Sequence, residues 1–263
     1  MSMTSAAAQT VRDVVRGGLR EGFTGVPRVT AIVPAFNEAE TVGSVIDTVR
    51  KSRLVDQVIV VDNASSDATA AVAAAHGAAV VRMPIPGKGQ AMAAGVAASE
   101  APYLLFLDAD LTNLRPDHVD GLVKPVVNGE AAMTLGMFDR GGATNAVMSR
   151  VLPKLTGERA MPRGIFESLL AKDAVGWRTE AAINRAAADE ALPVKSWVLD
   201  GMFHRTKEQK LGTPWEGFVA KTKMLSTASW AAAQLKVRDS LGFHPTGRQS
   251  IVDAVRGQYQ IDG

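Results

Sequence analysis

The stretch YLLFLDADL, residues 103–111, decides how the rest of the chain is interpreted. Its apolar run, Tyr103–Leu107, stops abruptly at two carboxylates, Asp108 and Asp110, with Ala109 between them. Five consecutive apolar residues are typical of a strand that is buried on both faces, as in a parallel sheet covered by helices. Ligands of open α/β sheets bind beyond the carboxyl ends of the strands, which is where both aspartates fall. The stretch therefore predicts a site at the tip of this strand.

Two carboxylates this close in sequence repel one another unless a cation or strong hydrogen-bond donors neutralise them. A hard divalent ion such as Mg²⁺ or Mn²⁺, shared with the phosphates of a substrate, suits such a pair. The alternative is that Asp108 and Asp110 only cap the helix or turn that follows. The remaining sequence decides between these two interpretations.

Outward from this stretch, short apolar runs alternate with single helical patterns. This order predicts right-handed βαβ units, and hence an α/β fold with a mostly parallel sheet and helices on both faces. The expected strands cover residues 29–33, 58–61, 79–82, 103–107 and 131–136, and the helices between them include 90–99 and 116–127.

The regular alternation ends near residue 138, which divides the predicted domain into two halves. We expect a leader at 1–27, a nucleotide-sugar half at 28–138, a smaller acceptor half at 139–237 and a loosely ordered tail at 238–263. The patterns in the acceptor half predict a strand at 194–203 and helices at 144–155, 165–172 and 214–237, with a further helix that follows Trp177–Glu180 and ends near 190.

The composition excludes several classes of protein. The net charge of +2 makes no case for nucleic-acid binding, and the absence of cysteine excludes disulfides and thiolate metal sites. No apolar run approaches the roughly 18 residues that span a bilayer, and the N-terminal residues lack the continuous apolar segment of a secretory signal. We therefore expect a soluble, cytoplasmic protein.

Two common phosphate-binding motifs are absent from the expected positions. A dinucleotide fold needs Gly-x-Gly-x-x-Gly after the first strand, where this chain has PAFNEAET at 34–41. A P-loop needs a glycine five residues before its Gly-Lys-Ser/Thr, whereas Gly87-Lys88 is preceded there by Arg82 and followed by Gly89. The remaining scheme is a nucleotide held by the ends of the first three strands, with its diphosphate on a metal at the fourth.

Four segments in this order resemble the nucleotide-binding half of family 2-like glycosyltransferases with the GT-A fold. They are PAFNEAETV (34–42), VVDNASSDAT (60–69), PGKGQAM (86–92) and FLDADL (106–111). A looser resemblance, over about 136–212, is to glucosyl-3-phosphoglycerate synthases and polyprenyl-phosphate glycosyltransferases. It is carried by GMFDR, LTGERAMPR, GWRTEAAIN and LDGMFHRTKEQKLG.

The resemblance implies a donor site built from the strand ends. Asp62 would accept a hydrogen bond from the base, which favours uracil, although Asp62 could instead be a helix cap, a role that Ser65 or Ser66 also offers. Gly87 would let the backbone approach the nucleotide, and Lys88 would help to neutralise its diphosphate. The base and ribose pocket would be lined by Pro34, Ala35, Asn37 and Glu38.

The same resemblance implies a metal site at the aspartates. Asp110 would ligate Mg²⁺ or Mn²⁺ directly, with His204 or Asp200 completing the cage. Asp108 would ligate through water or hold the sugar and ribose, with Ala109 beside it in the donor pocket. For His204, a purely structural role is the alternative.

Glu180 and the segment Gly157–Ala160, which contains Arg159, are the candidates for contacts to the donor sugar and the acceptor. Glu180, Arg159 and Asp108 are the residues expected to be catalytic. If the reaction inverts the anomeric configuration, a carboxylate must act as base, and Glu180 is the first choice. Glu180 also precedes a helical pattern, so it could be a first-turn glutamate favoured by the helix dipole. The Glu-Asp base dipeptide of inverting family 2 enzymes is absent, which leaves the stereochemistry open.

Basic residues near the expected site indicate an anionic acceptor, because arginine binds phosphate and carboxylate in bidentate fashion. The alternative is an ordinary solvated basic surface. The residues concerned are Arg140, Arg159, Arg163, Arg205 and Lys207. The lysine-rich helix expected at 214–237 could rest on the inner face of a membrane near a lipid-phosphate acceptor, or pack on the sheet or on a second subunit of a homodimer.

These observations predict a metal-dependent transferase that moves a hexose from a nucleoside-diphosphate sugar, with UDP-glucose the expected donor. The acceptor would be a small phosphorylated acid such as 3-phosphoglycerate or a polyprenyl phosphate. Two alternatives remain. One is a sugar nucleotidyltransferase, which would need a Gly-rich loop with Arg and Lys after the first strand. The other is a sugar-nucleotide-binding protein without turnover.

Overall fold

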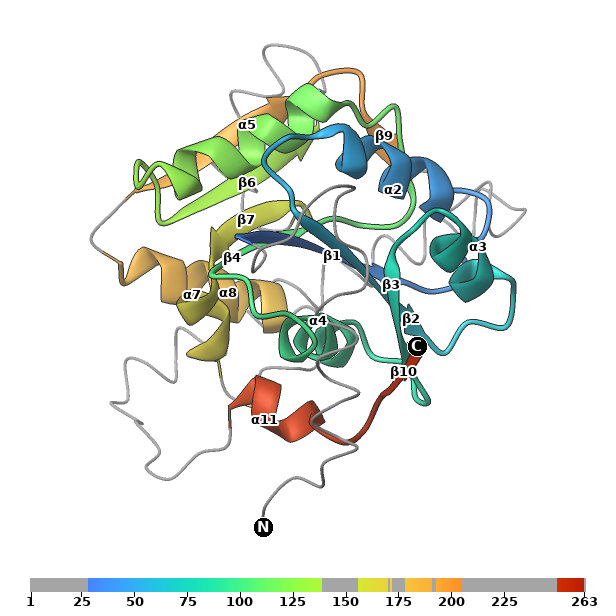
Figure 1. The fold of residues 1–263 in the computed structure, drawn as a ribbon. Coiled ribbons are helices and arrows are strands. Elements are labelled where there is room, and N and C mark those ends of the chain that lie inside the picture. Colours follow the sequence, from blue (N-terminus) through green and yellow to red (C-terminus); the bar gives the residue numbers. More distant parts are fainter. Residues whose placement is uncertain are drawn as a thin grey trace, which may run out of the picture.

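The structure, a computed structural model, describes residues 28–138, 156–169, 171, 178–190, 193–204 and 250–262. The leader expected at 1–27 and the helices expected at 144–155 and 214–237 lie outside these residues. Within the described part, the prediction of an α/β fold with helices on both faces of one sheet is confirmed (Figure 1).

In the part of the chain that the structure describes, the sheet has eight strands in the order β10-β3-β2-β1-β4-β7-β6-β8. The strands β1 to β4 are mutually parallel where they pair, and β6 and β8 form a second parallel pair. Strand β7 runs antiparallel between β4 and β6, and β10 runs antiparallel at the edge beside β3. The bounds are β1 Val29–Ala35, β2 Gln57–Asn63, β3 Ala79–Met83, β4 Tyr103–Phe106, β6 Met133–Phe138, β7 Arg159–Pro162, β8 Val194–Leu199 and β10 Gln260–Asp262.

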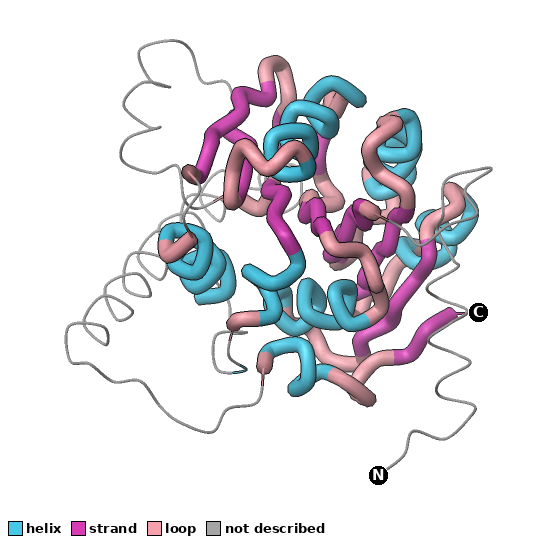
Figure 2. Tube along the Cα trace, turned by 60° about the vertical axis from the view of Figure 1, so that its left-hand side comes forward, coloured by secondary structure: helices cyan, strands magenta, loops and turns pink. Residues whose placement is uncertain are grey.

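Helices cover both faces of this sheet and form two separate apolar cores (Figures 1 and 2). One face packs against α2 Val42–Lys51, α3 Thr69–Ala75 and α5 Pro116–Val127. The other packs against α4 Lys88–Ala97, α7 Arg163–Glu167, α8 Arg178–Ala188 and α11 Ile251–Val255.

The apolar run 103–107, which contains strand β4, is buried on both of its faces. Leu104 and Phe106 point into the core with α4, whereas Leu105 and Leu107 point into the core with α2 and α5. All four are at most 1% exposed. Because side chains alternate between the faces of a strand, a strand between two helical layers has no position left for a polar residue. The predicted burial of both faces is confirmed.

Local sequence signals set several element ends. Helix α5 has the predicted bounds, because Pro116 fits a first helical turn and Gly129 (φ 72°) follows its end. Gly77 (φ 79°) follows α3 in the same way. The N-cap of α3 is Ala68 rather than Ser65 or Ser66, so that expectation was wrong: Asp67 accepts the hydrogen bond from the Thr69 amide instead.

Two expectations for the second half of the chain need correction. The strand expected at 194–203 is split by a turn at Gly201 (φ 68°), after which β9, Phe203–His204, pairs with β5, Leu111–Thr112. The tail expected from 238 onward is ordered over 250–262, where α11 packs on α4 and β10 extends the sheet. Short amphipathic segments of this kind derive their stability from tertiary packing, which local composition does not reveal.

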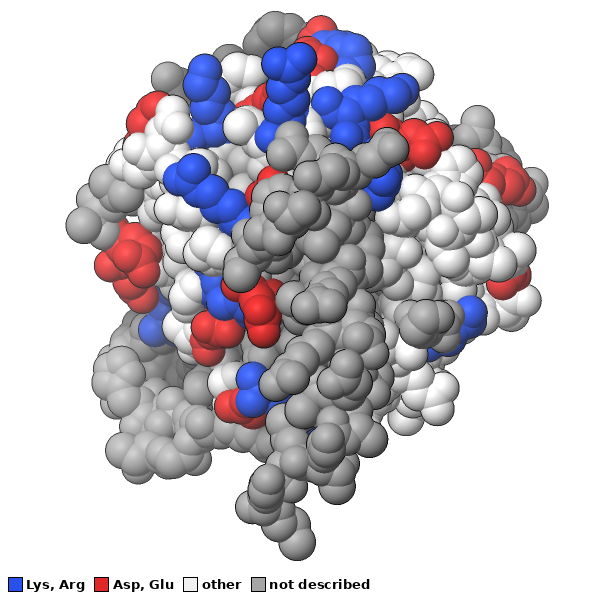
Figure 3. All heavy atoms as spheres, in the orientation of Figure 1, with Lys and Arg blue, Asp and Glu red and all other residues white. Residues whose placement is uncertain are grey.

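The described surface carries mixed charge. Figure 3 shows Lys and Arg gathered at the top, over α2 and α5, with Asp and Glu among them. Exposed ion pairs such as Lys195–Glu130, at 3.2 Å, contribute little to stability because solvent screens them. Among the described residues, no helix has the length and apolar character needed to cross a membrane.

Gly95 provides a test of how closely α4 packs on the sheet. A Cβ at this position would lie 2.4 Å from Cγ2 of Ile32 and 3.1 Å from Cγ2 of Val61. Gly95→Ala should therefore destabilise the protein by about 1–2 kcal/mol in urea unfolding, because overpacking outweighs the gain in helix propensity. Gly164→Ala is the matched control, since no heavy atom lies within 4 Å of its Cβ position. Equal stability of the two variants would contradict this packing.

Candidate active site

Asp108 and Asp110 lie in the short segment between β4, which ends at Phe106, and β5, which begins at Leu111. Strand β7 runs antiparallel beside β4, so the residues before Arg159 approach those after Phe106. Gly157 packs against Asp108 so closely that a Cβ on it would lie 2.6 Å from both carboxylate oxygens. The Asp108 side chain is 24% exposed and is thus held between the sheet and the surface.

Lys88 joins this aspartate to the second half of the domain. Its Nζ donates a hydrogen bond to Oδ1 of Asp108 at 2.9 Å and lies 3.4 Å from Oε1 of Glu180. Lys88 opens helix α4, and Glu180 lies in the first turn of α8. The fold therefore brings Lys88, predicted to bind the donor, next to Glu180, predicted to act in catalysis.

Glu180 is buried, with a side chain only 1% exposed. Neither of its carboxylate oxygens accepts a hydrogen bond from the described residues. A buried carboxylate without hydrogen-bond donors is costly unless a positive charge lies near it. Its position at the site, and not only at the start of a helix, favours the functional interpretation over the helix-dipole one.

The charge state of Lys88 follows from its neighbours. Burial alone lowers the pKa of its ammonium group, but the carboxylates of Asp108 and Glu180 outweigh this effect and raise the pKa well above the usual value. Lys88 is therefore a permanent cation at physiological pH. Because its pKa is raised in the folded state, its contribution to stability is fully present at neutral pH and is lost only in strong alkali.

Arg159 lies behind the site and has no exposed surface. Its guanidinium donates to the carbonyl of Glu180 at 3.4 Å, to Oδ1 of Asn184 at 3.3 Å and to the carbonyl of Thr156. Burial lowers its pKa, and the nearby Glu180 and Glu158 oppose this shift. The structure thus favours a positioning role for Arg159 over the direct substrate contact that we expected, because the side chain orients α8 from beneath.

Among the described side chains of this cluster, negative charge exceeds positive charge. The carboxylates of Asp108, Glu158 and Glu180 face the two cations Lys88 and Arg159, and Asp110 lies two residues beyond Asp108. Carboxylate oxygens are the preferred ligands of Mg²⁺ and Mn²⁺. The donor set therefore fits a divalent cation, although the described side chains contain no group of three or more metal-ligating residues already arranged around one point.

The pairing of β5 with β9 distinguishes the two residues proposed to complete the metal site. His204 lies opposite Leu111 in this ladder and hence next to Asp110 along the backbone; its side chain lies outside the described part. Asp200 instead accepts a hydrogen bond from Arg115 at 3.0 Å, and its Oδ1 lies 3.4 Å from Nε2 of His118. The backbone therefore brings His204 beside Asp110, whereas Asp200 contacts the start of α5, and metal ligation by His204 stays a prediction.

The residues expected around the base lie at the ends of β1 and β2. Asp62 is buried; its Oδ1 accepts from the Ser65 amide at 3.0 Å, and its Oδ2 lies 3.5 Å from Nη1 of Arg82. Arg82 was not anticipated, although the parallel register places it directly opposite Asp62. Asn63, also not anticipated, accepts a hydrogen bond from the Gly87 amide at 2.7 Å and so fixes the loop before Lys88.

The loop after β1 is fastened to the loop after β2. The Asn37 amide donates to Oγ of Ser65 at 3.0 Å, and Oδ1 of Asn37 accepts from the Ser66 amide at 2.8 Å. The Glu38 amide donates to Oγ1 of Thr69 at 2.8 Å. Asn37 and Ala64 both have positive φ, at 55° and 65°, which is rare for alanine and indicates a loop held in shape by its surroundings.

The remaining predicted residues have mixed outcomes. Pro34 and Ala35 lie at the end of β1, beside the Asp62 loop, and Ala109 is buried between the two aspartates. Arg163, expected to face an anionic acceptor, instead donates to the carbonyls of Val96 and Ala101 and closes the end of α4. Arg140, Arg205 and Lys207 lie outside the described residues.

The family model for glycosyl transferase family 2 matches residues 30–192, which include all of these elements up to α8. The chain belongs to glycosyl transferase family 2. A glucosyl-3-phosphoglycerate synthase of Mycolicibacterium paratuberculosis is 38% identical over 122 residues, which are 43% of this chain and 37% of that protein. The match thus spans little more than a third of that curated relative.

Solved structures resemble this protein over most of its length. Glucosyl-3-phosphoglycerate synthase from Mycobacterium tuberculosis, in complex with Mn²⁺, UDP-glucose and phosphoglyceric acid, has a TM-score of 0.63 and 26% identity over 88% of this chain and 91% of that one. The same enzyme with Mg²⁺ and UDP gives a TM-score of 0.63 at 25% identity, over 90% of this chain and 85% of that one.

Replacing Lys88 tests the charge balance of the site. Lys88→Met should destabilise the protein by about 1–3 kcal/mol at pH 8, because it leaves buried carboxylates without their cation. The measurement is urea unfolding at pH 8. Lys195→Met, which breaks the exposed pair with Glu130, is the control and should cost much less, because solvent screens an exposed ion pair.

A Lys88→Met penalty no larger than that of Lys195→Met would contradict this electrostatic description.

Proposed function

We propose that this protein transfers a glucosyl group from UDP-glucose to the hydroxyl group of a small phosphorylated acid such as 3-phosphoglycerate, with Mn²⁺ or Mg²⁺ as cofactor. The observation that carries the proposal is the excess of carboxylates around Lys88 at the tip of β4, in a family 2 glycosyltransferase domain. The ligands of the similar mycobacterial enzyme, UDP-glucose, Mn²⁺ and phosphoglyceric acid, support this choice of substrates and metal.

The reaction breaks the bond between the anomeric carbon and the diphosphate oxygen, and the bonding electron pair stays on the diphosphate. A new bond forms between the anomeric carbon and the acceptor oxygen, whose proton is released. Negative charge thus develops on the leaving diphosphate, and groups that stabilise it there accelerate the reaction. A bound divalent cation would supply Lewis-acid stabilisation of that charge, held by Asp110 and His204 with Asp108 close by.

Among the described side chains, Lys88 is the cation that contacts Asp108. Its ammonium group lies 2.9 Å from Asp108 and 3.4 Å from Glu180, so it can exchange one of these partners for a diphosphate oxygen without crossing the domain. Glu180 would then be available to a hydroxyl of the donor sugar or the acceptor. If the reaction inverts configuration, Glu180 would receive the acceptor proton.

On the donor side, Asp62 and the paired loops after β1 and β2 would hold the base and ribose. Pro34, Ala35, Asn37 and Glu38 belong to the first of these loops or to the strand end before it. Gly87 would present its backbone to the nucleotide while Asn63 fixes its orientation. Ala109 would approach the donor through its backbone, because its side chain is buried.

A polyprenyl phosphate is the second acceptor class. No described residue favours it, whereas the mycobacterial structures support a phosphoglycerate. Peripheral contact with the inner face of a membrane would follow from a lipid acceptor, and a homodimer is an independent expectation. Both predictions concern the segment 214–237, outside the described residues. With a water-soluble acceptor, we expect a cytoplasmic enzyme.

The test is release of UDP from UDP-glucose with Mn²⁺, supplied with either 3-phosphoglycerate or a polyprenyl phosphate in detergent. We expect a water-soluble glucosylated product, and none after chelation of the metal. Asp110→Asn should lower the rate by roughly 100-fold or more, because it removes a metal ligand. Asp117→Asn, an exposed aspartate at the start of α5, is the matched control and should leave the rate unchanged.

A lipid-extractable product would move the proposal to the second acceptor class. Pyrophosphate release from UTP and glucose 1-phosphate, with no transfer from UDP-glucose, would replace it with a nucleotidyltransferase. UDP-glucose binding without turnover on either acceptor would favour a binding protein.

A further inference from the structure

The C-terminal segment 250–262 lies beside the region expected to hold the base, although it follows the family match by more than fifty residues. Helix α11 is anchored by Ile251, Val252 and Val255, which are buried in the core that includes α4. The Ile251 amide also donates to the carbonyl of Leu169 at 3.0 Å. Gly257 (φ 85°) then turns the chain into β10, where Gln260 pairs with Arg82 of β3.

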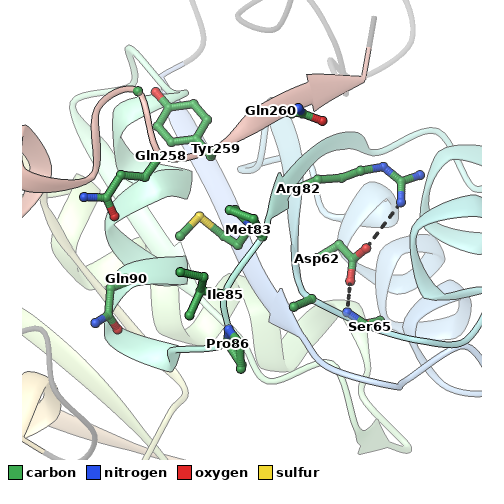
Figure 4. A pocket seen from close by; sticks show the side chains of 13 residues that line it. Asp62, Ser65, Arg82, Met83, Ile85, Pro86, Gln90, Gln258, Tyr259 and Gln260 are labelled. Carbon is green, nitrogen blue, oxygen red and sulfur yellow. Dashed lines mark hydrogen bonds and ion pairs between the residues drawn. The ribbon is translucent and has the colours of Figure 1, made fainter.

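This arrangement encloses a cavity of about 920 Å³ at the carboxyl ends of β2 and β3. One wall comes from Asp62, Ala64, Ser65 and Arg82, and the other from Gly257–Gln260. Figure 4 shows Gln258 on the same side as Gln90, Gln260 on the same side as Arg82, and Met83 and Ile85 between them. Asp62, the residue expected to bind the base, thus shares its cavity with the C-terminal segment.

The loop after β3 connects this cavity to the diphosphate site. Pro84, Ile85 and Pro86 line the cavity, and two residues later Lys88 reaches Asp108. A nucleotide with its diphosphate near Lys88 can therefore lie along residues 84–88 and place its base in the cavity. The Asn63 side chain, which binds the Gly87 amide, holds this stretch in place.

The lining matches the chemistry of a planar base. Ile85 is 71% exposed, an unusual state for a large aliphatic residue, and with Met83 it offers an apolar surface to a ring. Each glutamine amide carries both a hydrogen-bond donor and an acceptor, as does the edge of uracil. The side chains of Gln258 and Gln260 are exposed to solvent, so a base in the cavity could contact them without any rearrangement of the core.

We propose that Gly257–Gln260 form the outer wall of the base pocket and that Gln258 and Gln260 help to select the base of the donor. The proposal deepens the proposed function and rests on it for the identity of the ligand. It assigns a specificity role to a segment that lies outside the residues matched by the family model.

The test uses the full chain and two probes, UDP and inorganic pyrophosphate, each titrated calorimetrically in the presence of Mn²⁺. Gln260→Ala should weaken UDP binding about fivefold, the equivalent of one neutral hydrogen bond, and Gln258→Trp should weaken it more than tenfold by filling the cavity. Pyrophosphate, which lacks a base, should bind both variants within about twofold of the wild type. Arg256→Ala is the matched control, because this exposed residue of the same segment does not line the cavity.

If UDP binds the glutamine variants as tightly as it binds the wild type, the inference is wrong while the proposed function stands. An equal loss of UDP and pyrophosphate affinity would also overturn the inference, because the segment would then act on the diphosphate site or on the fold. A wild-type protein that binds neither probe would overturn the proposed function, and the inference with it.

Discussion

Lys88 is the cation on which the site depends. It balances Asp108, at the end of β4, against Glu180, in the first turn of α8, and without it two carboxylates from different parts of the chain would repel one another. Even with Lys88 and the buried Arg159, the carboxylates outnumber the cations among the side chains that the structure describes here. A site of this kind accepts additional positive charge readily and is therefore suited to a divalent cation brought in with a diphosphate.

The sheet order explains how these groups meet. Strand β4 lies between β1, which carries the donor-side loop, and β7, which runs the opposite way. The antiparallel direction of β7 brings Gly157 against Asp108, and the absence of a side chain on Gly157 leaves room for that carboxylate. Arg159, which pairs with Phe106 of β4, then fixes the start of α8 through its contacts to Glu180 and Asn184. The donor half and the acceptor half are thus joined through buried polar contacts at one point.

Features encoded locally were predictable from the sequence. The apolar run at 103–107 indicated a strand buried on both faces, and Pro116 and the glycine after the helix set the limits of α5. Asp108, Asp110 and Asp62 were recognisable because each follows an apolar strand. Their position at the carboxyl ends of strands follows from topology alone.

Features that depend on distant partners were not predictable. The sequence does not show that Arg159 would lie in the core, because arginine is seldom buried and its partners Glu180 and Asn184 lie in α8, further along the chain. Nor did it reveal the pairing of Asp200 with Arg115, which are 85 residues apart. The edge strand β10 is three residues long and polar on one side, so only its packing beside β3 identifies it as a strand.

The central claim is that a divalent cation and the diphosphate of a nucleotide bind together at the tip of β4. The most direct measurement is calorimetric titration of UDP into the wild-type protein, once with Mn²⁺ and once with the metal chelated. The charge balance predicts that Mn²⁺ tightens UDP binding at least tenfold and that Gly157→Ala, which displaces Asp108, removes most of this gain. Equal UDP affinity with and without the metal would contradict the account.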